Sequence, residues 1–304
     1  MLDPVSVEVF VRVAQRLNIS AAGRDLGLSA AVASRRLQQL EDALETRLFH
    51  RTTREVTLTG DGEQFLPYAE ALLASHERAL AAVGPAAERV RGVLRVSAPS
   101  SFGQLHMVPV IKDFLAQHRE LELDLHLSDE VVDLAREGFD VVVRNAALTG
   151  SMSSLRARRL ARDRRVVCAA PSYLERHGVP EQPGELAQHE CVVLHDHSTW
   201  IVGGPDGPQS VRVRGRLRVS DGLSMLAAAE DGLGVVLISR WAASAALACG
   251  QLVPILTAFP VISEHAIWAL YLDGVVSPKV RAFIDFFADR FGDPPYWEAA
   301  AEPP

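Results

Sequence analysis

The first 45 residues contain three segments in which apolar residues recur at helical spacing. An Asp-Pro pair opens the first segment, residues 3–17, and both residue types favour a helix start. We expect Ser20 to cap a short second helix, which Gly27 ends, and Ser29 to cap a third helix running to about residue 44. Two helices joined by a short glycine-containing turn are typical of a helix-turn-helix.

The predicted third helix has two distinct faces. Its apolar residues repeat every three or four positions and are expected to pack inward. A second face carries small residues first and hydrogen-bonding residues further along: Ala31, Ser34, Arg35 and Gln38. A helix that enters the DNA major groove requires this arrangement. The alternative is a solvated surface face, which the capped helix and the tight turn before it disfavour.

Residues 54–58 alternate like a strand, and residues 48–58 therefore predict a β-hairpin. The expected tip consists of Arg51, Thr52, Thr53 and Arg54. These side chains suit contact with DNA phosphates or insertion into the minor groove. An ordinary polar hairpin tip is the alternative interpretation.

A long helix is predicted from Gly62 to about Val83. Its apolar seam has alternating steps of three and four residues, like a coiled coil: Leu66, Ala69, Leu73, His76, Leu80 and Val83. Such a seam between two domains favours self-association into a two-fold dimer, which would present two recognition helices. Burial of the helix within its own domain is the alternative.

Beyond residue 90, predicted strands alternate with predicted helices, which indicates a parallel or mixed α/β sheet. The first strand starts at Gly92, and Ser100 or Ser101 is expected to cap the helix after it. Further strands are expected at residues 121–127, 140–144, 165–169, 191–195, 211–219, 235–238 and 263–272. Helices are expected at residues 131–137 and 278–291.

Composition limits the class of protein. The chain has 304 residues, no apolar run long enough to cross a membrane and no apparent signal peptide, so we expect a soluble, cytoplasmic protein. Its net charge is −7. Eight arginines and seven acidic residues give residues 1–60 a net charge of +1, so the remainder carries −8. The net charge argues against nonspecific coating of nucleic acid, but it is compatible with a slightly basic reading module on an acidic body.

Residues 1–60 resemble the winged helix-turn-helix of LysR-type transcriptional regulators. The resemblance rests on the stretches SAAGRDLGLS at 20–29, SRRLQQLE at 34–41 and LFHRTTR at 48–54. The family usually has Gln-Pro after the capping serine, whereas this chain has Ala30-Ala31. A base-reading glutamine is therefore missing, and Ser34, Arg35 and Gln38 are expected to carry more of the readout. The resemblance implies this set of DNA-binding residues: Ser29, Ala30, Ala31, Ser34, Arg35, Gln38, Arg51, Thr52, Thr53 and Arg54.

The resemblance extends over nearly the whole chain and implies an α/β protein with an all-α winged helix-turn-helix, a long linker helix and a two-lobed, periplasmic-binding-protein-like domain. We place the DNA-binding domain at 1–60, the linker and dimerisation helix at 61–89, the effector-binding domain at 90–292 and a flexible tail at 293–304. Lobe I would comprise 90–163 and 267–292, and lobe II 164–266. The family implies a homotetramer, formed from two dimers, that binds an inverted repeat in promoter DNA.

A small-molecule effector is expected beyond the carboxyl ends of the strands in the two lobes. Hydroxyl groups at a helix start and an arginine suit a small anion such as a carboxylate. The expected effector-binding residues are Ser100, Ser101, Ser128, Arg144, His197 and Trp200. Two alternatives to effector binding have similar weight: Ser100 and Ser101 could simply cap a helix, and Arg144 could form a structural ion pair.

The residues also bear on three other functions. No nucleophile elbow, phosphate-binding loop or HExxH motif is present, so we expect neither an enzyme nor a bound cofactor. A zinc site at His189, Cys191, His195 and His197 is disfavoured, because a strand would separate Cys191 from His195 by about 13 Å. A redox-sensing regulator of the same fold is the remaining alternative, but Cys168 and Cys191 lie on predicted buried strands, where thiols are usually inert.

Overall fold

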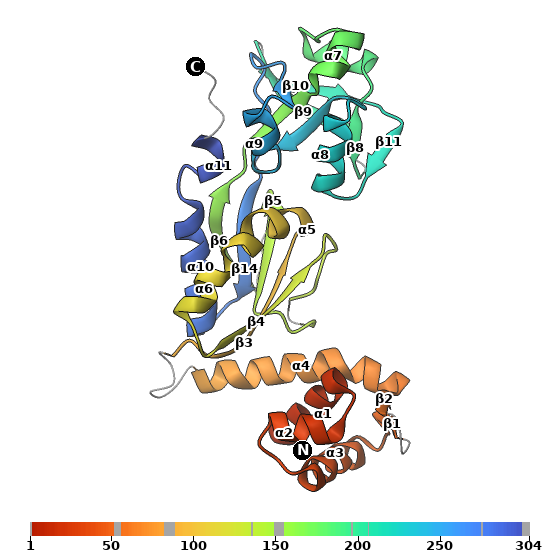
Figure 1. The fold of residues 1–304 in the computed structure, drawn as a ribbon, viewed down its shortest axis with the longest axis vertical. Coiled ribbons are helices and arrows are strands. Elements are labelled where there is room, and N and C mark those ends of the chain that lie inside the picture. The colour runs from red at the N-terminus through yellow and green to blue at the C-terminus, as the bar shows by residue number, and fades with distance from the viewer. Residues whose placement is uncertain are drawn as a thin grey trace. The chain divides into compact units, whose positions relative to one another are not determined.

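The computed structural model describes residues 2–51, 56–81, 89–134, 136–148, 155–195, 197–205, 207–274 and 276–299. The chain forms two compact units (Figure 1). The first consists of residues 1–90 with the short segments 132–140 and 272–280, and the second of residues 91–131, 141–271 and 281–304.

The N-terminal part of the first unit is a winged helix-turn-helix, as predicted. Its elements are α1 (Pro4–Arg16), α2 (Ile19–Asp25), α3 (Ala30–Leu44), β1 (Phe49–Arg51), β2 (Val56–Leu58) and α4 (Gly60–Ala81). The two strands pair antiparallel, with Phe49 opposite Leu58. Apolar residues from all three short helices and from β1 form one core, in which the rings of Phe10 and Phe49 lie 5.4 Å apart.

Side-chain caps set the starts of the three short helices. Asp3 caps α1, and the Ser29 hydroxyl accepts a hydrogen bond from the Val32 amide of α3 at 3.3 Å, as predicted. The predicted cap of the second helix was wrong. Asn18, in an extended conformation, caps α2 by accepting from Ala21 N at 2.8 Å. Ser20 lies within the first turn, where its hydroxyl cannot serve as the cap.

The long helix α4 divides its apolar residues between two environments. Ala69 is fully buried, and Phe65, Leu66, Leu72 and Leu73 pack against the core of the helix-turn-helix. The expectation that the whole seam faces a partner was therefore wrong for its N-terminal half, because α1 already covers it. Tyr68, which lies between these packed residues, is 56% exposed, and Leu80 near the C-terminal end of α4 is 57% exposed. Val83 lies outside the described residues.

The second unit contains two lobes. The first lobe is built on a five-stranded mixed sheet with the order β4-β3-β5-β14-β6. Its strands are β3 (Gly92–Ala98), β4 (Leu121–Leu127), β5 (Val141–Ala146), β6 (Leu155–Arg162) and β14 (Ala266–Leu272). β3 pairs parallel with β4 and β5, whereas β14 runs antiparallel to β5. The helices associated with this lobe are α5 (Ser100–Phe102), a π-helical turn (Gly103–Met107), α6 (Val108–Gln117), α10 (Pro278–Phe291) and α11 (Tyr296–Ala299).

The second lobe contains three small sheets, with the strand orders β12-β7-β13, β11-β8 and β10-β9. Its strands are β7 (Arg165–Ala169), β8 (Val192–Leu194), β9 (Thr199–Gly204), β10 (Gly207–Arg212), β11 (Leu217–Val219), β12 (Val236–Ser239) and β13 (Val253–Pro254). Its helices are α7 (Pro171–His177), a 3₁₀ turn (Pro183–Gln188), α8 (Gly222–Glu230) and α9 (Arg240–Ala248). One apolar core joins these elements.

Two local predictions were wrong. The described residues of 131–137 form an irregular segment and a turn instead of a helix, because the Glu137 carboxylate accepts from the Asp133 amide and the Asp133 carboxylate accepts from the Arg136 amide. The predicted strand 211–219 is divided into β10 and β11. A Cβ at Gly215 would lie 1.5 Å from the Cys191 carbonyl oxygen, so the chain passes too close to its neighbour for a side chain there.

The segment expected to be a flexible tail contains α11. Trp297 on this helix is 2% exposed, because it packs against Phe102 and Phe291 at ring distances of 6.0 and 5.3 Å. The prediction overlooked the size of the apolar surface that a tryptophan buries. Residues 300–304 lie outside the described part of the chain.

Candidate functional site

The exposed face of α3 is the candidate DNA-reading surface. Ala30, Ala31 and Arg35 are exposed, and Ser34 is half-buried. Arg35 makes no ion pair or hydrogen bond with another side chain in the described ranges. Ser29 uses its hydroxyl to cap the helix, which leaves only its backbone and its hydroxyl proton for a ligand.

Gln38 lies on the same face but is held within the protein. Its Nε2 donates to Asp42 Oδ1 at 2.6 Å, and its Oε1 accepts from Arg47 Nη1 at 3.0 Å. A base contact by Gln38 must therefore replace at least one of these hydrogen bonds. Sequence periodicity placed Gln38 on the correct face but gave no sign of these partners.

Arg36 has a structural role that separates it from its neighbour Arg35. Its Nη1 lies 2.8 Å from Asp3 Oδ2, the carboxylate that also accepts from the Ser6 amide and hydroxyl. The ion pair thus connects α3 to the N-terminus of α1. The bond to the Ser6 hydroxyl is the main cause that lowers the pKa of Asp3.

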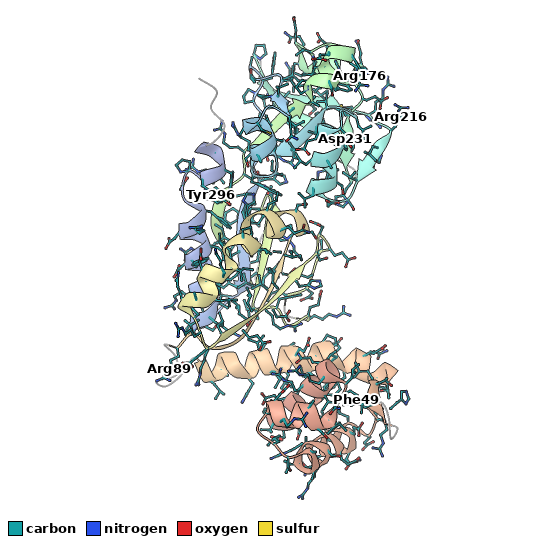
Figure 2. All side chains as sticks on the ribbon, viewed as in Figure 1. Phe49, Arg89, Arg176, Arg216, Asp231 and Tyr296 are labelled. Atoms are coloured by element: carbon teal, nitrogen blue, oxygen red, sulfur yellow. The ribbon has the colours of Figure 1, made fainter. Side chains whose placement is uncertain are left out.

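The wing is attached to α3 by a buried carboxylate that sequence reasoning missed. Glu41 is 2% exposed, and its Oε1 accepts from the amides of Leu48 and Phe49 at 2.9 and 3.3 Å. Its Oε2 lies 3.2 Å from Arg47 Nη1. Phe49, labelled in Figure 2, is itself 3% exposed. Glu41 therefore fixes the position at which the wing leaves the helix.

Thr59 and Gly62 fix the other end of the wing. The Thr59 hydroxyl donates to the Arg47 carbonyl at 2.7 Å and accepts from the Gly62 amide at 3.0 Å. A Cβ at Gly62 would lie 2.2 Å from the Leu48 carbonyl oxygen, so only glycine fits there without a shift. Of the predicted wing residues, Thr52, Thr53, Arg54 and the side chain of Arg51 lie outside the described residues.

Three of the four predicted effector residues of the first lobe have side-chain partners within the protein. Ser101 is 3% exposed, and its hydroxyl accepts from the Leu223 amide at 3.0 Å. Arg144 donates to Ser97 Oγ and to the carbonyls of Val143 and Glu130. The Ser128 hydroxyl accepts from the Glu130 amide at 3.2 Å, and Ser100 is half-buried in the first turn of α5.

The prediction that Ser100 or Ser101 caps its own helix was wrong. Pro99 occupies the cap position of α5, without a side-chain hydrogen bond. Ser101 instead supports the first turn of α8, a helix of the other lobe, whose cap is Asp221. The hydroxyl thus connects the two lobes.

Replacing Ser101 by alanine should lower the stability of the second unit by about 1 kcal/mol, because the Leu223 amide loses its acceptor. Thermal unfolding of the full chain measures this loss. Ser100→Ala, next to it in the same helix, is the matched control and should change the melting temperature little. Equal effects of the two substitutions would contradict the assigned role of Ser101.

The other two predicted effector residues, His197 and Trp200, line a cavity of about 390 Å³. His197 is exposed, and Trp200 is 5% exposed. The cavity lies where β7, β9 and the segment 261–265 meet, and its lining also includes Arg165, Glu264 and His265. Ser100, Ser101, Ser128 and Arg144 are not part of its described lining.

Arg165, His197 and His265 line this cavity together with Glu264. His265 is half-buried, and burial is the main cause that lowers its pKa, followed by the positive charges of Arg165 and His197. The pKa of Arg165 is lowered by burial as well. An anion in the cavity would relieve this repulsion, and Glu264 at the edge would oppose it.

A buried aromatic cluster connects α11 to both lobes. His106 Nδ1 lies 2.6 Å from Tyr296 Oη, and its Nε2 lies 3.1 Å from the Trp241 carbonyl oxygen. A carbonyl only accepts, so Nε2 carries the proton and the Tyr296 hydroxyl donates to Nδ1. Tyr296 is labelled on α11 in Figure 2. Burial lowers the pKa of His106 to about 4.

A second buried titratable group lies where the chain passes between the lobes. Asp163 is 5% exposed, and its Oδ2 accepts from Asn145 Nδ2 at 3.0 Å and from Ser239 Oγ at 2.9 Å. Burial raises the pKa of Asp163 to about 6, against the lowering by these bonds and by Arg165.

Asp163 and His106 are expected to give opposite pH dependences. Asp163 should destabilise the fold as pH rises from about 4 to 6, since the unfolded chain releases this proton first. His106 should stabilise the fold as pH rises from about 4 to 6.5, since in this pH range the imidazole is protonated in the unfolded chain but not in the folded one. Each effect is of the order of 3 kcal/mol, so the two nearly cancel.

Melting temperatures between pH 4.5 and 7.5 separate the two effects. As pH rises, the melting temperature of Asp163→Asn should increase relative to that of the parent. The melting temperature of His106→Gln should decrease relative to that of the parent over the same range. Three parallel profiles would contradict both assignments.

The structure offers little support for a thiol or metal centre. Burial raises the pKa of Cys168 and of Cys191 to about 12, so neither thiol ionises readily at neutral pH. Cys249 is exposed, with its Sγ 3.1 Å from Gln251 Oε1. Among the described residues, no group of three or more His, Cys, Asp or Glu side chains could hold a metal ion.

No described helix has the length and apolar character required to cross a membrane.

Two family models match the chain. Residues 5–63 match the bacterial regulatory helix-turn-helix protein, lysR family, and residues 87–292 match the LysR substrate binding domain. The two matches cover the helix-turn-helix with its wing and most of the two lobes.

Curated relatives and solved structures agree with these matches over almost the full length. The HTH-type transcriptional regulator DmlR of Escherichia coli is 30% identical over 292 residues, covering 94% of each chain. The transcriptional activator TtdR of Escherichia coli is 31% identical over 299 residues, covering 95% of this chain and 94% of the relative. The Vibrio cholerae virulence activator AphB has a TM-score of 0.61 at 28% identity, covering 94% of this chain and 99% of its own. CrgA of Neisseria meningitidis, a LysR-type transcriptional regulator, has a TM-score of 0.60 at 28% identity, covering 94% and 97%.

Proposed function

The chain belongs to the LysR family of transcriptional regulators, and we propose that Arg35 of each subunit reads the operator while an anionic effector binds beside Arg165. As a member, it is a DNA-binding regulator that responds to a small molecule. We propose further which residues read the DNA, what kind of effector binds and how the subunits assemble. We also propose that the protein acts in the cytoplasm and has no enzymatic activity.

DNA reading is proposed for the exposed face of α3 together with the wing. The proposal is supported by the exposed Arg35 and by the small residues Ala30 and Ala31, which permit close approach of the helix to base edges. Ser34 and, after a change of partners, Gln38 would contribute neighbouring contacts. The residues 51–54 would hold the DNA backbone or minor groove.

We propose a homodimer formed through exposed apolar side chains of α4, within the helix predicted at 61–89. The support is the large exposed surface of Tyr68 and Leu80, which the subunit itself does not cover. Two such dimers would form the homotetramer and present recognition helices to an inverted repeat. Footprinting on the DNA upstream of the chain's own gene tests this assembly. Protection of a short inverted repeat would support it, and absence of protection would count against it.

The effector is proposed to be a small anion in the 390 Å³ cavity. The observation that carries this proposal is the convergence of Arg165, His197 and His265 on one cavity. Trp200 would pack against the apolar part of the molecule. The first-lobe residues Ser101 and Arg144 would act indirectly, because they position the strand ends and α8.

The charge of the effector can be tested with matched probes. Succinate and benzoate should stabilise the full chain in thermal unfolding, whereas succinamide and benzamide should not. A ligand at 100 times its dissociation constant adds about 2.7 kcal/mol of stability. His197→Gln should weaken binding of the anions, and binding should strengthen as pH falls from 8 to 6. Equal stabilisation by the neutral amides would contradict an anion site.

A further inference from the structure

A second, larger cavity lies in the second lobe on the other side of Arg165. Its volume is about 860 Å³, within the range of roughly 300–1,000 Å³ that is typical of small-molecule sites. Arg165 lines both this cavity and the proposed effector cavity. None of the predicted effector residues lines this larger cavity, and the proposed effector binds in the smaller one.

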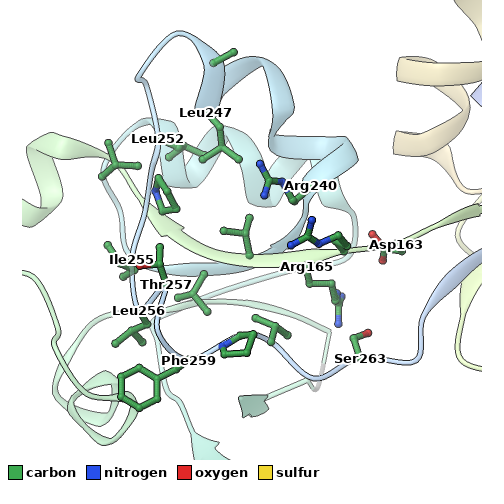
Figure 3. A pocket seen from close by; sticks show the side chains of 18 of the residues that line it. Asp163, Arg165, Arg240, Leu247, Leu252, Ile255, Leu256, Thr257, Phe259 and Ser263 are labelled. Atoms are coloured by element: carbon green, nitrogen blue, oxygen red, sulfur yellow. The ribbon is translucent and has the colours of Figure 1, made fainter. Parts of the chain in front are cut away.

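The walls of this cavity divide by polarity (Figure 3). Apolar side chains from the end of α9 and the loop around β13 form one side: Leu247, Leu252, Ile255, Leu256 and Phe259. Asp163, Arg165 and Arg240 lie together on the opposite side. A ligand that fits both sides has an aliphatic body and an anionic head.

The polar side contains buried atoms that lack a hydrogen-bond partner. Asp163 Oδ2 is satisfied by Asn145 and Ser239, but Asp163 Oδ1 has no partner. Arg165 Nε, a neighbouring donor, also has none. Because buried polar atoms are nearly always hydrogen-bonded, this pair favours a ligand that supplies one donor and one acceptor side by side.

We propose that this cavity binds a free hydroxy-carboxylic acid with an aliphatic chain of about eight to twelve carbons. The carboxylate would face Arg165, and the hydroxyl would donate to Asp163 Oδ1. The chain would lie along Leu247, Val253 and Phe259, which line the cavity and are half-buried. Since Arg165 also borders the effector cavity, occupation of either cavity changes the affinity of the other by the same factor.

Calorimetric titration of the full-length chain with butanoate, hexanoate, decanoate and 3-hydroxydecanoate tests the proposal. Each methylene buried on the apolar side should strengthen binding about fourfold. 3-Hydroxydecanoate should bind at least fivefold more tightly than decanoate, and decyltrimethylammonium should bind more weakly than decanoate. Affinity that does not depend on chain length, or that favours the cation, would overturn the proposal.

Two tryptophan substitutions on α9 provide a matched pair. Ala248 lines the cavity and is exposed, so Ala248→Trp should fill it and weaken 3-hydroxydecanoate binding at least tenfold. Ala245 is exposed on the same helix outside the lining, and Ala245→Trp should change binding less than twofold. Equal weakening by both substitutions would overturn the site, and thermal unfolding checks that both variants fold.

Other occupants would give different results. If a second copy of the chain covered this cavity, Ala248→Trp would lower the oligomeric state in sedimentation while the acids showed no binding. If the cavity faced a lipid bilayer, the chain would bind phosphatidylglycerol vesicles but not monomeric acid. Either result overturns the proposal. His197→Gln should leave 3-hydroxydecanoate binding intact, so failure of the effector site is distinguishable from failure of this one.

Discussion

Replacing Glu41 by alanine is expected to destabilise the winged helix-turn-helix by about 3 kcal/mol or more. The carboxylate accepts from the amides of Leu48 and Phe49, which are 1% and 3% exposed. Without Glu41 these two donors have no partner and cannot reach water. The wing should then separate from α3, and operator affinity should fall with it.

Amide hydrogen exchange in the full chain measures this effect locally, which matters because a chain of two units does not unfold in one step. Protection of Leu48 and Phe49 should fall by about two orders of magnitude in Glu41→Ala. Glu41→Gln keeps one acceptor oxygen and should lose less. Glu8→Ala, at an exposed acidic position of α1, is the matched control and should leave protection unchanged. Unchanged protection in Glu41→Ala would contradict the assigned role.

Glu41 also illustrates what sequence patterns can and cannot predict. Helical periodicity correctly gave α3 and its cap Ser29, since both depend on residues close together in the chain. The burial of Glu41 depends on how residues 47–49 return to the helix, and the sequence displays only an acid between two arginine clusters. The same limit applies to α4, where periodicity identified the apolar face but not which part α1 covers.

The ligand sites show this limit more strongly. Strand ends were predicted from residue patterns, and His197 and Trp200 do share a cavity. Arg165 and His265 escaped prediction, because each comes from a separate crossing between the lobes and only the folded chain brings them together. Ser101 and Arg144 have the chemistry of anion-binding residues, but both are engaged within the protein. Ser101 accepts from the Leu223 amide of α8, and Arg144 donates to the Glu130 carbonyl beyond a strand end.

Replacing Arg35 by alanine is expected to weaken operator binding by about 1–3 kcal/mol for each recognition helix, roughly 5- to 150-fold. A dimer that engages two half-sites would lose up to twice this free energy. The reason is that Arg35 is the exposed cation of α3 that no described side chain holds, so it can pair with a guanine edge or a phosphate. Titrations against operator and unrelated DNA at one salt concentration measure the loss.

Its neighbour Arg36 is the matched control, since both substitutions remove one arginine from the same helix. Arg36 pairs with Asp3 at the N-terminus of α1, with 40% of its side chain exposed. Arg36→Ala should therefore lower stability by less than about 1 kcal/mol and change operator affinity less than threefold. If Arg36→Ala weakened operator binding as much as Arg35→Ala, the loss would reflect net charge instead of a placed contact.

Arg35→Lys separates base reading from phosphate contact. Lysine retains the charge but cannot form the two parallel hydrogen bonds that a guanidinium makes to guanine. If Arg35 reads a base, the lysine variant should keep its affinity for unrelated DNA and lose most of its preference for the operator. If it contacts phosphate, preference should survive in the lysine variant, and Arg35→Ala should instead reduce the slope of log affinity against log salt by about one. Because residues 1–60 carry a net charge of only +1, placed contacts of this kind must supply most of the specificity, and the lysine variant measures that share directly.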